Sequence, residues 1–189
     1  FTYGFGAGVS PWGKGYDLGF LRCHGLWFPE EQGLVCEDGL FMLALFSKVS
    51  CAAVLPDCLY RYYRNSNSLS RRFQPDRQVR NNGFLKTCTE LIRANGLPEK
   101  TLFHIHARYH GLTLGTMGAL LDSDLPRREK NRQLSRLFRD PVLAETLQQE
   151  VLALDAPMPR LFWRCLKQKW YGLCRLLLWA NGLKKRREV

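Results

Sequence analysis

Two adjacent carboxylates, Glu37 and Asp38, stand directly before an apolar run with helical spacing. A carboxylate at the start of such a helix can act as a general base, because it can accept the proton of an attacking hydroxyl group. The same pair would also stabilise a helix start by capping it and by facing the positive end of the helix dipole. The pair alone therefore leaves a catalytic and a structural interpretation open.

Residues suited to binding a sugar or a phosphate lie on both sides of this pair. Upstream, Trp12 could stack on a sugar face and Lys14 could face a phosphate or an acceptor. Downstream, Arg and Ser side chains could donate hydrogen bonds to a diphosphate: Arg64, Ser66, Ser68 and Arg71. The alternative for each is structural: a buried Trp, a solvated Lys and an ordinary polar turn.

The order and spacing of these elements resemble a known enzyme family over about residues 9–72. Trp12-Gly-Lys14, then Gly25-Leu-Trp-Phe28-Pro29, then Glu37-Asp38, then Tyr60, Tyr62, Arg64 and Ser68 are similar to the second half of a family 2 glycosyltransferase of the GT-A fold. Gly13 stands where that family usually has Asn. The resemblance implies an α/β, Rossmann-like domain, with Asp38 as the base of an inverting transfer and Glu37 as a residue that orients the site or contacts the acceptor.

The resemblance also implies substrates and a cofactor. They are a nucleotide-sugar donor, a glycan or lipid-linked acceptor of the cell-surface polysaccharide type, and a divalent cation (Mn or Mg) whose Asp-x-Asp ligands would lie upstream of this chain. Asp122-Ser-Asp124 is too far downstream for that motif, and we interpret it as a loop. Because the chain begins at Phe1 and shows no signal peptide, we expect a C-terminal fragment of a bacterial enzyme that is inactive alone.

The sequence pattern divides the chain into three parts. Residues 1–72 would be the end of the catalytic domain, with strands at 26–28, 51–55 and 59–64 and a helix over 38–48. Residues 73–158 favour helices at 77–94, from Pro98 toward Leu121, and from an Asp140 cap to about Leu154. Residues 159–189 would form a basic amphipathic helix over 160–180 and a tail.

The net charge of +11 is concentrated near the end of the chain, where residues 159–189 hold nine Lys/Arg and one Asp/Glu. Trp and Leu are interleaved with these cations, a pattern typical of a helix that lies on an anionic membrane. The alternative is a helix packed on the protein with its basic face in solvent. We expect a cytoplasmic protein, peripheral on the inner face of the cell membrane, and no nucleic-acid partner. The alternative function is a non-catalytic, membrane-associated helical adaptor.

Cysteine and histidine spacings favour structural roles. The seven Cys form no C-x-x-C motif, and their number is odd, so we expect free, reduced thiols and no structural zinc site. His106 and His110 have the i, i+4 spacing that can bind a metal, but no Glu follows His106. We therefore interpret both histidines as structural residues.

Overall fold

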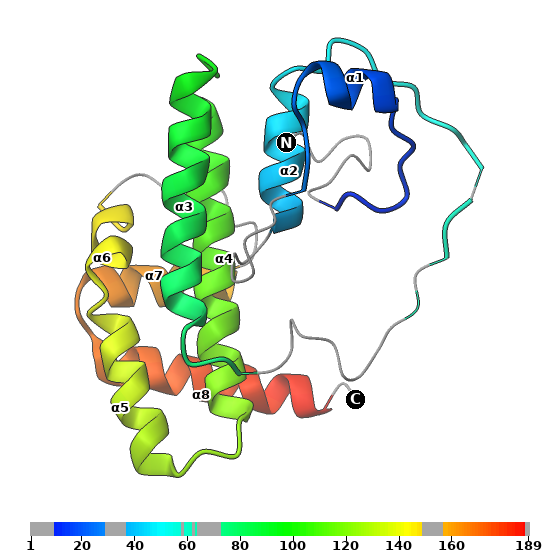
Figure 1. Ribbon diagram of the computed structural model, residues 1–189. Helices are drawn as coiled ribbons and strands as arrows, with labels where there is room; N and C mark the ends of the chain where they lie inside the picture. The colour runs from blue at the N-terminus through cyan, green and yellow to red at the C-terminus, as the bar shows by residue number, and fades with distance from the viewer. Residues whose placement is uncertain are drawn as a thin grey trace.

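The computed structural model describes residues 10–28, 37–57, 59–61, 63, 73–148 and 157–187. These residues form helices joined by irregular segments (Figure 1). The helices are α1 (Leu18–Cys23), α2 (Glu37–Phe46), α3 (Arg77–Ala94), α4 (Lys100–Asp122), α5 (Arg127–Phe138), α6 (Pro141–Thr146), α7 (Pro157–Lys167) and α8 (Tyr171–Arg187).

The expected α/β, GT-A-like fold is wrong for the part of the chain that the structure describes, because that part contains no strand. Segments 26–28 and 51–55 are irregular, as are residues 59–61 and 63. Val54 and Leu59 are 69% and 77% exposed. A strand needs a neighbour to pair its backbone groups and cover its apolar face, and these segments have no such neighbour among the described residues.

Helices α3 and α4 lie side by side as the long central pair of the molecule (Figure 1). Their bounds agree with the helices predicted over 77–94 and from Pro98 toward Leu121. The turn between them is closed by Gly96 in a left-handed conformation (φ 59°). The N–H of Leu97 donates to the Ile92 carbonyl at 3.0 Å. Gly is the residue that adopts this helix-ending geometry without steric cost, so Asn95-Gly96 was a reliable stop signal.

A polar network lies between α3 and α4. The Tyr109 hydroxyl donates to Asn82 Oδ1 at 2.8 Å and accepts from Gln78 Nε2 at 3.1 Å. Asn81 Nδ2 donates to Thr116 Oγ1 at 3.1 Å. Because buried polar groups are costly unless they are paired, these bonds hold the two helices in one register.

Asp140 connects this network to α6. Its Oδ1 accepts from the N–H of Leu143 at 2.9 Å, and its Oδ2 accepts from Asn82 Nδ2 at 3.0 Å. The predicted cap is therefore confirmed, with Pro141 in the first helical turn. The helix is shorter than expected, because α6 ends at Thr146 and a turn follows at 147–148.

The single helix expected over 160–180 is instead two helices, α7 and α8. Lys169 has a positive φ of 60°, and the N–H of Trp170 donates to the Cys165 carbonyl at 2.9 Å. This is the same helix-ending pattern that Gly96 makes, here built on a Lys. Asn181-Gly182, the expected stop, lies inside α8. On α8, Arg175 donates to Ser135 Oγ of α5 at 2.7 Å.

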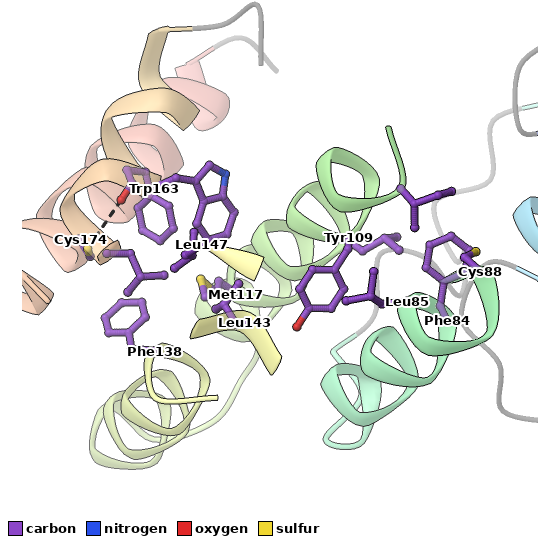
Figure 2. Close-up of a cluster of buried hydrophobic side chains, with 14 of the residues drawn as sticks. Phe84, Leu85, Cys88, Tyr109, Met117, Phe138, Leu143, Leu147, Trp163 and Cys174 are labelled. Atoms are coloured by element: carbon purple, nitrogen blue, oxygen red, sulfur yellow. Dashed lines mark hydrogen bonds between the residues drawn. The ribbon is translucent and has the colours of Figure 1, made fainter. Parts of the chain in front are cut away.

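One apolar cluster joins α3 to α8, and Figure 2 shows part of it. Phe84 and Leu85 contribute from α3, and Met117 lies on α4. The last two helices enter the same cluster through Trp163 of α7 and Cys174 of α8, and the Cys174 thiol faces the Phe162 carbonyl at 4.0 Å (Figure 2). The five described cysteines are free: Cys23 and Cys51 are exposed, and Cys88, Cys165 and Cys174 are buried.

Candidate functional site

Helix α2 positions the two carboxylates. It is apolar on all sides, as is typical of a buried helix. Leu40 and Leu43 belong to the large cluster that contains α3, whereas Phe41, Met42 and Leu45 pack in a second cluster with α1. Because packing on both sides fixes this helix, its first turn is held in place. The predicted helix over 38–48 is confirmed, and Glu37 and Asp38 lie in its first turn.

Asp38 and Glu37 differ in their environment. Asp38 is half-buried, whereas Glu37 is exposed. Burial raises the pKa of Asp38 above its ordinary value, and the negative charge of Glu37 raises it further. A carboxylate with a raised pKa holds a proton more readily and is therefore a stronger base. Asp38 is accordingly the better placed of the two to receive a proton, and Glu37 is placed to modulate it.

Tyr16 is a neighbour of Asp38 that the sequence pattern did not indicate. Its hydroxyl donates to the Pro11 carbonyl at 2.6 Å, and its ring meets Phe41 edge-on with the centroids 5.6 Å apart. Burial raises the pKa of Tyr16, and the charge of Asp38 adds to this effect. Tyr16 therefore anchors the segment that carries Trp12 and Lys14 against α2. Its distance along the chain from Asp38 left no local signal in the sequence.

The Trp12-Gly-Lys14 segment presents an aromatic surface. The Trp12 ring stacks on Tyr60 with the centroids 5.4 Å apart, and the two side chains are 45% and 52% exposed. Gly13 between Trp12 and Lys14 has a φ of 71°, which a residue with a side chain adopts only at a cost. The Lys14 ammonium group donates to the Ser10 carbonyl at 2.6 Å, and the side chain is half-buried. Trp12 is thus no core residue, and Tyr60 is its exposed partner.

A second aromatic pair covers α2 next to Tyr16. Phe28 stacks on Phe41 with the centroids 4.1 Å apart and the ring planes within 15°. Phe28 is half exposed, and its neighbour Trp27 is largely exposed. Aromatic faces are the surfaces on which sugar rings pack, because they offer a flat apolar area beside polar groups. The segment from Leu26 to Phe28 therefore adds to the surface around α2, although it is not the strand that was expected.

The structure brings some of the predicted site residues together. Tyr16 links the Trp12–Lys14 segment to α2, the helix that carries Asp38, because it bonds to the Pro11 carbonyl and its ring meets Phe41. Four of the predicted phosphate ligands, Arg64, Ser66, Ser68 and Arg71, lie outside the described residues. Within the described residues, no three His, Cys, Asp or Glu side chains gather into a metal site.

The two helical histidines are core residues of α4. His110 is fully buried, and its Nε2 lies 2.9 Å from Thr146 Oγ1 of α6. Its ring lies against Trp163 of α7 with the centroids 4.8 Å apart. Burial lowers the pKa of His110 to about 4, with a further contribution from His106. Burial also lowers the pKa of His106. The neutral imidazoles thus act in packing, consistent with the structural interpretation of the sequence.

Comparison with known proteins yields no relative. No family model, no curated protein and no solved structure matches the chain.

Proposed function

We propose that this chain supplies the base-bearing, acceptor-side part of an inverting glycosyltransferase. The observation that supports this function best is the half-buried Asp38 in the first turn of α2, with a raised pKa and with Tyr16, which follows the Trp-x-Lys segment, packed on Phe41 of the same helix. The resemblance of the motif set to family 2 glycosyltransferases gives the reaction class. The proposal needs no sheet, because it rests on these side chains and their neighbours.

In the proposed reaction, Asp38 removes the proton of the acceptor hydroxyl group. The acceptor oxygen forms a bond to the anomeric carbon of the donor sugar while the bond from that carbon to the nucleoside diphosphate breaks. The bonding electrons leave with the diphosphate, and the configuration at the anomeric carbon is inverted. Asp38 must be ionised to accept the proton, so the rate falls as the pH falls through its raised pKa.

The aromatic residues near α2 would orient the acceptor. The stacked pair Trp12–Tyr60 offers exposed ring surface to a sugar, and Phe28 offers another beside Phe41. Holding the acceptor hydroxyl group against Asp38 in one geometry lowers the entropic cost of the reaction. Lys14 would hold the segment in shape through its bond to Ser10, with its charge close to the acceptor.

The donor would be a nucleotide sugar, and its substrate partner a glycan or a lipid-linked acceptor. Arg64 and Arg71 would bind the diphosphate through paired N–H groups, with Ser66 and Ser68 as weaker donors. A divalent cation, held by residues outside the described ones, would neutralise charge on the leaving diphosphate.

The test is Asp38→Asn in the protein expressed from its native reading frame. Membranes from such cells are supplied with UDP-glucose, UDP-galactose, UDP-N-acetylglucosamine, GDP-mannose and dTDP-rhamnose in turn, and release of the nucleoside diphosphate is measured. We expect transfer to fall by about 10²- to 10⁴-fold, the usual contribution of a general base, while the affinity for the donor stays within about threefold.

Asp17→Asn is the matched control, because it makes the same charge change near the same segment. Asp17 caps α1 by accepting from the N–H of Phe20 at 2.9 Å, and Asn caps a helix as well as Asp does. This variant should transfer sugar at the wild-type rate. An Asp38→Asn protein that keeps the wild-type rate refutes the proposal. Membranes that release no nucleoside diphosphate from any donor favour the adaptor function instead.

A further inference from the structure

An exposed apolar surface runs along α8. Leu173, Leu176 and Trp179 recur every third residue and therefore lie within about a third of the helix circumference. Leu176 and Trp179 are 56% and 62% exposed. We call these three residues the α8 stripe. Gly172 and Ala180, which fall on the same arc, are also exposed and carry no charge.

The opposite side of α8 packs against the rest of the protein. Cys174 and Leu178 are buried in the main cluster. Tyr171 stacks on Phe138 of α5 with the centroids 5.6 Å apart, and Arg175 donates to Ser135 of the same helix. Because α8 is already packed on the protein by this side, its exposed stripe is not needed for the fold.

Lys and Arg residues flank the α8 stripe on both sides in the sequence. Residues 157–187 contain nine Lys or Arg and no Asp or Glu. Lys167 and Lys169 precede α8, with the exposed Trp170 beside them, and the sequence of α8 itself ends in Lys184-Lys-Arg-Arg187. A second copy of the chain would bring nine further cations against these nine, which disfavours a dimer through this face.

From the exposed stripe and the charge around it, we propose that the α7–α8 hairpin docks on an anionic lipid bilayer, with Leu173, Leu176 and Trp179 inserted among the acyl chains near the headgroups. Trp is suited to this depth because it has a large apolar ring and one polar N–H. The Lys and Arg residues attract the anionic headgroups. None of the described helices is both long and apolar enough to cross a bilayer. This docking stands apart from the proposed transfer reaction, because neither α7 nor α8 carries a residue of that site.

Vesicle sedimentation with the full chain tests the docking. The probes are vesicles of phosphatidylcholine with 30% phosphatidylglycerol and vesicles of phosphatidylcholine alone. Each Lys or Arg near an anionic surface contributes a factor of about five to binding. Even a few such residues therefore make the affinity for the anionic vesicles more than about tenfold higher, and this preference should weaken as salt is added.

Leu176→Glu and Val79→Glu form a matched pair of variants. Both replace an exposed apolar residue by Glu and change the net charge equally, but Val79 is 72% exposed on α3 and is not part of the α8 stripe. Leu176→Glu should lower the affinity for anionic vesicles by about tenfold or more, because it removes inserted apolar area and places a like charge at the surface. Val79→Glu should lower it by less than about threefold. Equal losses in the two variants would overturn the proposal.

Quenching of the wild-type tryptophan fluorescence gives an answer that needs no variant. Vesicles with brominated acyl chains should quench the emission of Trp179 and Trp170, and the unbrominated vesicles should shift that emission to shorter wavelength. Emission that stays unquenched while the chain is bound means that no tryptophan ring, that of Trp179 included, inserts into the bilayer. The docking is then refuted. A chain that binds a DNA duplex but sediments with neither kind of vesicle refutes it as well.

Discussion

The buried His110 makes the stability of the fold depend on pH in a way that can be calculated. The pKa of His110 is about 4 in the folded chain, compared with an ordinary value of 6.5. Below pH 6.5 the unfolded chain therefore binds a proton that the folded chain does not bind. Linkage then requires the free energy of unfolding to fall as the pH falls from 6.5 to 4. His106, whose pKa is also lowered by burial, acts in the same direction.

The size of this loss follows from the two pKa values of His110. Between pH 7.5 and 4.5, the difference in proton binding costs about 2.5 kcal/mol of unfolding free energy. For a chain of this length that loss corresponds to a drop of about 5–10 °C in Tm. Two other groups lie next to these histidines. The negative charge of Glu145 raises the pKa of His106 and so opposes the effect of burial. The Tyr109 ring lies beside His110, with the centroids 5.9 Å apart.

The assay is urea unfolding at pH 7.5 and 4.5, followed by circular dichroism. His110→Gln removes the titrating group and keeps a side chain able to bond to Thr146. It should lower the neutral-pH stability through lost packing on Trp163, but its loss between the two pH values should be about 2.5 kcal/mol smaller than that of the wild type. His104→Gln, at an exposed position of the same helix, should behave as the wild type does. If His110→Gln loses as much stability as the wild type, the assignment of a depressed pKa to His110 is refuted.

Two further predictions concern the packing of the helices. Tyr109→Phe removes the hydroxyl bonded to Gln78 Nε2 and Asn82 Oδ1, and it should cost about 1–2 kcal/mol in urea unfolding, because each of these two atoms loses one hydrogen-bond partner and keeps only the bond between them; an unchanged midpoint would contradict the role of the network. At the α7–α8 turn, Lys169→Gly should raise the midpoint and Lys169→Val should lower it, each by about 1 kcal/mol, because Gly relieves the positive φ and a β-branched side chain worsens it. The opposite order would show that Lys169 does not adopt this conformation.

Local signals in the sequence predicted the helical region well. Helix α3 begins and ends where the spacing and Asn95-Gly96 place it, and Asp140 caps α6 with its own side chain. These features depend on residues a few positions apart, so the sequence alone specifies them. The break at Lys169 lacks the usual Gly, and packing of the two helices on the rest of the protein overrides the amphipathic pattern across it.

The strands could not be judged from local pattern alone. Segments 51–55 and 59–64 have the composition of strands, but a strand forms only where another strand pairs with it. For a similar reason, the local pattern predicted only part of the candidate site. The start of α2 and the carboxylate pair follow from a local pattern, whereas the contact of Tyr16 with this helix, and the stacking of Trp12 on Tyr60, come from the packing of distant segments.

The most direct test of Asp38 as a base is the pH dependence of kcat/KM in the protein expressed from its native reading frame. The wild type should lose activity at low pH with a slope of one proton, and the apparent pKa of this limb should lie above 3.8, the ordinary value for Asp. The residual transfer by Asp38→Asn should not show this limb. A variant that retains both the wild-type rate and the acid limb would contradict the assignment of Asp38 as the catalytic base.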